Sequence, residues 1–200
     1  MSGGLDSCVS AAVAAEDHDL ALLHISYGQL TEARELQAFT AIADHFAVER
    51  RLVCQLSHLR QIGGTSLIAT GSGHNDLGPT VPTSPLPDCG DLPDTYVPFR
   101  NANLLAVAVS WSETLGAAAV FVGAHQAVGT GPNTDLRIRT PLLHLDKAAI
   151  VRLGTTLDAP LDMTWSCYRH TERACGNCHS CQLRRSGFAD AGVPDLIPYA

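Results

Sequence analysis

Apolar side chains recur three to four positions apart in some segments of this chain and form short continuous runs in others. The runs at residues 20–26, 51–54 and 117–123 have the length of buried strands. Residues 31–46 carry apolar side chains at helical spacing, which predicts an amphipathic helix with Thr31 as its cap. The pattern therefore predicts strands that alternate with helices.

Further helices follow from the same reading. Residues 5–15 follow a glycine turn, and residues 101–115 form a helix that is apolar on most faces, is ended by Gly116 and is expected to be largely buried. Three later elements are predicted: an extended segment at 137–143, a helix capped by Asp146 that runs to about 157, and a short helix at about 181–190. Strand–helix alternation predicts an α/β fold, a parallel sheet with helices on both faces.

Residues 63–98 interrupt this pattern, because they are rich in glycine, proline and small polar residues. A loop of this length inside a domain is usually functional or mobile. It is interpreted either as a mobile active-site flap or as a surface insertion.

Composition narrows the class of protein. A chain of 200 residues, 46% of them apolar, fits a single domain over residues 1–200. The net charge of −7 argues against general nucleic-acid binding, and no apolar run approaches the ~20 residues of a membrane span. The start at Met1 has neither a charged region nor an apolar run, so no signal peptide is expected. Four of the seven cysteines crowd into residues 167–181, which favours a reducing, cytoplasmic compartment and a metal site.

The first chemical motif is Ser2-Gly3-Gly4-Leu5-Asp6-Ser7. Two glycines let consecutive N–H groups form an anion nest, and the helix that begins there adds its dipole. The hydroxyls of Ser2 and Ser7 can donate to phosphate oxygens, and Asp6 would hold Mg²⁺ or cap the turn. The alternative is a plain glycine turn capped by Asp6.

The second motif is Cys167-x7-Cys175-x2-Cys178-x2-Cys181. Four thiolates at this spacing predict closed, tetrahedral structural zinc. An iron–sulfur cluster and a disulfide pair are the alternatives. His170 and His179 are interpreted as solvated loop residues. Cys8 and Cys54 lie in apolar runs and are predicted core residues.

With both motifs identified, the sequence resembles the 7-cyano-7-deazaguanine synthase family of queuosine biosynthesis, the N-type ATP pyrophosphatases. The resemblance covers most of the chain and rests on the loop, the four-cysteine motif and these segments: Tyr27-Gly28-Gln29, Val97-Pro98-Phe99-Arg100-Asn101, Gly123-Ala124-His125 and Thr164-Trp165-Ser166-Cys167-Tyr168. The loop alone would also fit NAD or GMP synthetases and tRNA thiolation enzymes.

The resemblance implies a Rossmann-like, adenine nucleotide alpha-hydrolase-like fold with a small zinc-binding region at about 164–190. It also implies an ATP-dependent ligase that converts 7-carboxy-7-deazaguanine and ammonia to 7-cyano-7-deazaguanine, with Mg²⁺, free ammonia and a possible homodimer. The predicted cofactor-binding residues are Ser2, Gly3, Gly4, Leu5, Asp6, Ser7 and Cys8.

The predicted catalytic residues are Asp6, Arg100 and Lys147. Arg100 is a candidate cation for the phosphates or the substrate carboxylate, and a surface pair with Asp94 is its alternative. Lys147 would reach phosphate or would be a solvated lysine at a helix start. Asn101 would cap its helix or touch substrate.

Further positively charged or titratable side chains carry weaker predictions. His125 would lie in the cleft or in the core. Arg184 and Arg185 would neutralise the last helix or bind ATP phosphates. A nucleic-acid reader built on the local basic patch of Arg169, Arg173, Arg184 and Arg185 is a remote alternative.

The chain departs from the family pattern twice. The family has an apolar strand before the loop, whereas only Met1 precedes Ser2, so the sheet is expected to lack a central strand and the chain to be truncated or mis-started. The family also carries a longer segment where residues 126–135 form a short turn. A related enzyme that adenylates another substrate, and a catalytically impaired zinc-bearing protein, are therefore alternatives.

Overall fold

The computed structural model describes residues 1–63, 65–68, 96–97, 99–123 and 136–200. Along the chain, the elements are α1 (Leu5–Ala15), β1 (Leu22–Ser26), α2 (Glu32–His45), β2 (Arg51–Gln55), α3 (Ser57–Ile62), α4 (Arg100–Leu115), β3 (Ala119–Phe121), β4 (Arg137–Arg139), α5 (Lys147–Thr156), the 3₁₀ turn η1 (Leu161–Met163) and α6 (His179–Ala191). The expected alternation of strands and helices is confirmed. Helix α3 was not expected. Most of the predicted 63–98 loop lies outside the described residues, as does Cys89.

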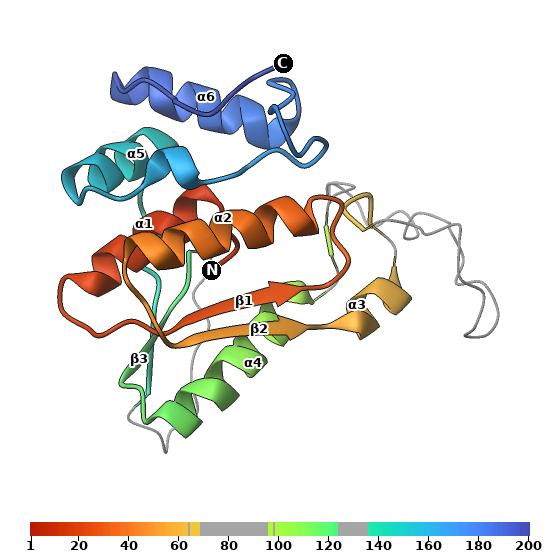
Figure 1. Ribbon diagram of the computed structural model, residues 1–200, viewed down its shortest axis with the longest axis vertical. Coiled ribbons are helices and arrows are strands. Elements are labelled where there is room, and N and C mark those ends of the chain that lie inside the picture. Colours follow the sequence, from red (N-terminus) through yellow and green to blue (C-terminus); the bar gives the residue numbers. More distant parts are fainter. Residues whose placement is uncertain (64, 69–95, 98, 124–135) are drawn as a thin grey trace.

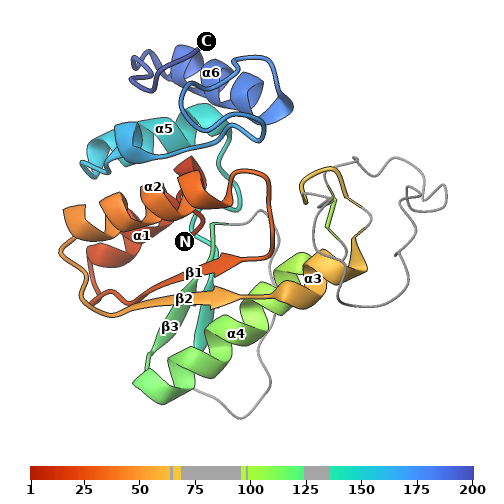
Figure 2. The same ribbon diagram turned by 45° about the vertical axis from the view of Figure 1, so that its right-hand side comes forward.

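The strands pair in parallel, as the alternation predicts. β1 pairs with β2 from Leu22↔Arg51 to Ser26↔Gln55, and β3 pairs with β4 from Ala119↔Arg137 to Phe121↔Arg139. Figures 1 and 2 show α1 and α2 on one side of the β1–β2 pair and α4 on the other. The parallel α/β class is therefore confirmed.

Within the described part of the chain, the two strand pairs do not join into one sheet. Met1 lies beside β1. Its N-terminal amino group donates to the carbonyl of Leu23, and its own carbonyl forms a hydrogen bond with His24 Nδ1 at 3.0 Å. These contacts fix the residue that leads into the glycine turn.

The largest core of the described residues lies where α1 packs against α5 and η1, and α6 packs on α5. Gly154 of α5 makes this approach possible, since a methyl group there would lie 2.8 Å from Val9 Cγ2 and 2.9 Å from Leu161 Cδ2. The buried residues of this core include Leu5, Cys8, Val9, Ile42, Leu142, Ile150, Val151 and Phe188. Figure 1 shows α5 and α6 stacked beyond α1, with the C-terminus beside α6.

Two burial predictions are wrong. α4 is as long as expected and ends at Gly116 in the left-handed conformation, but its only buried residue is Ser112. A pair of strands presents a surface only about 10 Å wide, which is too narrow to cover several faces of a helix. Cys54 is half-exposed rather than buried, because among the described strands β2 pairs only with β1.

Helix capping follows the sequence in one case and not in another. Asp146 accepts a hydrogen bond from the Ala149 N–H at 2.7 Å and so caps α5, as predicted. Thr31 precedes α2 but its hydroxyl donates to Glu35 at 2.8 Å instead of capping. Within the described residues, no helix is both long and apolar enough to cross a membrane.

Candidate phosphate-binding loop and metal centre

The glycine turn leads directly into α1. Gly3 has a φ of +79°, and Gly4 is the extended residue that precedes the helix. The hydroxyls of Ser2 and Ser7 lie 3.1 Å apart, the Gly4 N–H donates to Ser2 Oγ at 3.2 Å, and Ser7 Oγ donates to the Gly4 carbonyl at 2.9 Å. Hydroxyls and an N–H group thus gather at the positive end of a helix dipole, which is a favourable place for an anion.

Segments distant in sequence enclose this turn. A methyl group on Gly3 would lie 2.6 Å from the Glu35 carbonyl, and one on Gly123, at the end of β3, would lie 2.9 Å from the Asp6 carbonyl carbon. The backbone N–H of Trp165 donates to the Gly3 carbonyl at 2.8 Å. Gly123, the first residue of the Gly-Ala-His segment, and Trp165 of the Thr-Trp-Ser-Cys segment therefore meet at the loop.

Lys147 lies against the loop and is not a solvated lysine. Its Nζ contacts both carboxylate oxygens of Asp6, at 2.6 and 2.9 Å, and each side chain is 23% exposed. A carboxylate and an ammonium group thus form an ion pair at the N-terminus of α1, where both remain partly exposed to solvent.

Two residues of the predicted cofactor-binding segment point into the core. Leu5 and Cys8 are both buried, and Cys8 Sγ faces the Pro160 carbonyl at 3.9 Å. Burial raises the pKa of the Cys8 thiol to about 12, so it stays protonated. Only the backbone of these two residues borders the loop.

Arg100 lies beside the carboxyl end of β1. Its guanidinium donates to Tyr27 Oη at 3.4 Å and to Asn101 Oδ1 at 3.3 Å. Asn101 therefore orients Arg100, and it does not cap α4, whose preceding residue is Phe99. The proposed alternative partner Asp94 lies outside the described residues, and so does His125.

A polar network that the sequence reading missed lies next to Arg100. Gln29 Nε2 and Thr31 Oγ1 donate to the two carboxylate oxygens of Glu35, at 3.0 and 2.8 Å. Burial raises the pKa of Glu35, although these donors and the positive charge of Arg100 oppose the shift. Burial likewise raises the pKa of Tyr27, against the influence of Arg100.

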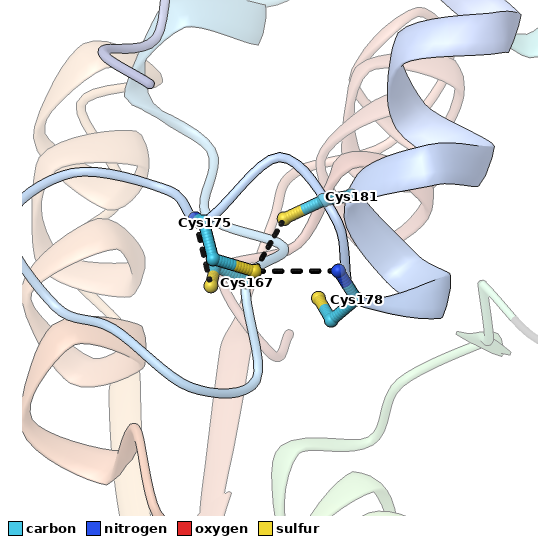
Figure 3. Close-up of side chains that lie close together, drawn as sticks. All are labelled: Cys167, Cys175, Cys178 and Cys181. Atoms are coloured by element: carbon cyan, nitrogen blue, oxygen red, sulfur yellow. Dashed lines mark hydrogen bonds between the residues drawn. The ribbon is translucent and has the colours of Figure 1, made fainter. Parts of the chain in front are cut away.

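The four cysteines of the second motif converge on one point (Figure 3). Cys167, Cys175, Cys178 and Cys181 place their sulfurs within 4.8 Å of one another. The sulfurs of Cys175 and Cys181 are 3.9 Å apart, close to the roughly 3.8 Å edge of a tetrahedron with Zn–S bonds of about 2.3 Å. The set fits a closed, four-thiolate metal site.

Backbone N–H groups support negative charge on these sulfurs. Arg169, His170 and Cys175 each direct an N–H at Cys167 Sγ at 3.4 Å, and Cys178 directs one at Cys175 Sγ at 3.3 Å.

The thiol pKa values differ within the set. Burial alone would raise the pKa of Cys175, but N–H donors from Asn177 and Cys178 and the neighbouring thiols outweigh it and lower the pKa to about 6. Burial raises the pKa of Cys181. A bound metal requires all four as thiolates, so metal binding would release protons.

The side chains around the metal site have structural roles. His170 is exposed, as expected, whereas His179 is exposed but begins α6 rather than lying in a loop. Arg184 is only 2% exposed and makes a two-point contact with Asp195, so it is unavailable for phosphates or nucleic acid. Arg185 stacks on Tyr199, 5.5 Å from the ring centre.

The sequence reading also missed how Trp165 is fixed. Its ring lies under the guanidinium of Arg34, 4.5 Å from the ring centre, and its Nε1 donates to the His170 carbonyl. The tryptophan within the Thr-Trp-Ser-Cys segment was the available signal, but its contact with Gly3 uses the backbone and leaves no trace in the sequence.

A helix that begins at a glycine turn, a parallel α/β framework and a lysine–aspartate pair together define a pyrophosphate-loop protein. The model of the family described as "Queuosine biosynthesis protein QueC" matches residues 1–131 and 124–192. The chain therefore belongs to the QueC family, whose members are enzymes.

Curated relatives align with the whole of this chain. It is 42% identical over 223 residues to the 7-cyano-7-deazaguanine synthase of Acidobacterium capsulatum, 42% over 224 residues to that of Chlorobium phaeobacteroides, and 43% over 221 residues to that of Chloroherpeton thalassium. Each alignment covers 100% of this chain and 94% of the relative.

The family match is interrupted where the sequence departs from the pattern. Its two parts overlap at residues 124–131, which include part of the segment 126–135 that the sequence predicts to be shortened.

Proposed function

We propose that this chain is an ATP-dependent ligase that converts 7-carboxy-7-deazaguanine and ammonia to 7-cyano-7-deazaguanine. The observation that carries the proposal is the glycine turn at the start of α1, held by distant segments and bordered by the Lys147–Asp6 pair. Family membership and relatives named for this synthase support the same activity.

A carboxylate is a poor electrophile, because its leaving group would be oxide. The substrate carboxylate attacks the α-phosphorus of ATP, which forms an acyl-adenylate and releases pyrophosphate. Ammonia then displaces AMP to give an amide. The amide oxygen attacks the α-phosphorus of a second ATP, which releases a second pyrophosphate. Loss of AMP and a proton leaves the nitrile. The protein contributes mainly position and charge neutralisation.

The loop residues Ser2, Gly3, Gly4 and Ser7 would hold the phosphates through hydroxyl and N–H groups. Asp6 would bind Mg²⁺, which supplies charge neutralisation, and Lys147 would then be available to phosphate oxygens. Arg100 would neutralise the substrate carboxylate or the developing phosphate charge.

We also propose zinc as the metal of the four-cysteine site. Four soft thiolates favour zinc over Mg²⁺ or Ca²⁺ and leave no open position for water, which makes the role structural. A metal analysis that finds one zinc per chain supports this assignment. Iron together with acid-labile sulfide would show that the site holds an iron–sulfur cluster instead.

We infer a cytoplasmic protein, because the six cysteines in the described part of the chain form no disulfide. We infer a homodimer from exposed apolar side chains on neighbouring elements. Val53 of β2, Ile62 of α3 and Phe99 before α4 are 48%, 54% and 75% exposed. Light scattering on the purified protein tests the dimer, and a monomeric mass at micromolar concentration overturns it.

The activity is tested with purified, zinc-loaded chain, Mg-ATP and ammonium, with and without the deazaguanine acid. Mass spectrometry follows the nitrile, and AMP release follows ATP use. Turnover that requires the acid, is lost in Asp6→Ala and is kept in Asp17→Ala, an exposed carboxylate beyond the far end of α1, supports the proposal.

The departure of residues 126–135 from the family pattern leaves one alternative, an enzyme that adenylates a different substrate. ATP binding without turnover on the deazaguanine acid would point to that alternative. A folded, zinc-loaded sample that neither binds nor consumes ATP would instead indicate a non-catalytic family member.

A further inference from the structure

The metal module, defined as residues 164–181, touches the phosphate loop just ahead of its first ligand. Trp165 lies two residues before Cys167 and donates its backbone N–H to the Gly3 carbonyl at 2.8 Å. The indole is 2% exposed and its Nε1 donates to the His170 carbonyl at 3.1 Å, while the His170 N–H points at Cys167 Sγ. The position of Trp165 is thus tied to the ligand loop.

This contact decides which way the loop N–H groups point. In a trans peptide the C=O and N–H bonds point in opposite directions, so a Gly3 carbonyl held by Trp165 turns the Gly4 N–H away from the metal module. That N–H donates to Ser2 Oγ at 3.2 Å, within the cluster of hydroxyls. Gly3 has little freedom to rotate otherwise, since Glu35 and Ala38 close in on it.

A second contact follows the last ligand. Cys178 and Cys181 lie at the start of α6, and Gly187 lies farther along the same helix. A methyl group on Gly187 would overlap Lys147 Cγ and would lie 3.2 Å from the Lys147 carbonyl carbon. Lys147 Nζ contacts both oxygens of Asp6, so α6 packs directly against the side chain that pairs with the loop aspartate.

Arg184 joins the two contacts into one unit. From α6 it donates to Thr164 Oγ1 at 2.6 Å, next to Trp165, and to the Leu161 carbonyl at 3.0 Å. Both the segment before the first cysteine and the helix after the last one are therefore fixed to each other as well as to the loop.

We propose that the four-cysteine metal centre positions the phosphate loop through Trp165 and Lys147, so that metal binding and ATP binding strengthen each other. The inference rests on the proposed function for the identity of its ligand, ATP. Linkage requires the coupling to be reciprocal, because each ligand must change the affinity of the other by the same factor.

The first test uses the wild-type holoprotein. Zinc is partitioned at equilibrium between the protein and a chelator of known affinity, with and without saturating Mg-ATP. ATP is expected to raise the zinc affinity about 5-fold or more. An unchanged partition in a sample shown by calorimetry to bind ATP overturns the coupling alone, whereas absence of ATP binding by the zinc-loaded protein overturns the proposed function.

The second test is Gly187→Ala, which keeps all four cysteines. We expect full zinc content, an unchanged circular dichroism spectrum, ATP binding weakened about 10-fold, and a smaller effect of ATP on zinc partition. Ser186→Ala, an exposed neighbour on α6, is the control and should match wild type. ATP affinity in Gly187→Ala equal to wild type would refute the route through Lys147. If Gly187→Ala does not fold, the wild-type partition still decides.

Discussion

Replacement of Arg184 by Met is expected to destabilise the protein strongly. Its guanidinium contacts both oxygens of Asp195 at 2.9 Å and also bonds Thr164 and the Leu161 carbonyl. The side chains of Arg184 and Asp195 are only 2% and 9% exposed. Removing the arginine leaves a buried carboxylate whose other donors are Tyr199 Oη, at 2.6 Å, and the Ile197 N–H.

The expected cost is about 3–5 kcal/mol, the range for a buried ion pair that loses one partner. In a domain of this size each kcal/mol lowers the Tm by about 2–4 °C, so a drop of roughly 10 °C follows. Arg184→Lys should recover only part of this stability, because an ammonium group cannot reproduce the planar two-point contact.

Urea unfolding of zinc-loaded samples, followed by circular dichroism, measures the effect. The double variant Arg184→Met/Asp195→Asn removes the unpaired charge but keeps an acceptor for Tyr199, so it should be more stable than Arg184→Met alone. The reasoning is refuted if Arg184→Met costs less than about 1 kcal/mol, or if the double variant is no more stable than the single one.

Four further predictions follow from the same contacts. Cys175→Ser should lose most of its zinc by metal analysis, and full retention would contradict a four-cysteine site. Lys147→Met should lower ATP turnover about 100-fold, and normal turnover would show that the ammonium group has no part in the reaction. Burial raises the Cys8 pKa from 9.0 to about 12, so native Cys8 should resist alkylation at pH 8.5 while half-exposed Cys54 reacts, as measured by peptide mass spectrometry. For the same reason, the free energy of unfolding should fall as pH rises from 9 towards 12, as measured by urea unfolding. Burial also raises the pKa of Glu35, so the folded state loses stability as pH rises through that pKa. The stability of Glu35→Gln relative to wild type should therefore increase from pH 4 to pH 7. A stability difference that does not depend on pH would contradict this assignment.

Single residues predicted where some helices begin or end. Gly116 ends α4 because glycine adopts the left-handed conformation cheaply, and Asp146 caps α5 with its own side chain. The four cysteines were identified as one site, because their spacing alone brings the sulfurs close together.

Burial was less predictable, because it depends on which partners surround an element. The apolar pattern of α4 predicts a buried helix, but the strand pair beside it is too narrow to cover it. Arg184 looks like a surface residue in sequence, and it is buried only because Asp195 and Thr164 meet it across the fold.

Side-chain identity and local spacing are enough to predict the α/β class, the glycine turn, the metal-ligand set and the family resemblance. How these parts connect depends on long-range contacts that no local pattern carries. The contact of Trp165 with Gly3 runs through backbone atoms, and that of Gly187 with Lys147 depends on the absence of a side chain. Neither contact leaves a pattern in the sequence that identifies its partner, so long-range packing alone reveals that the metal module and the phosphate loop form one unit.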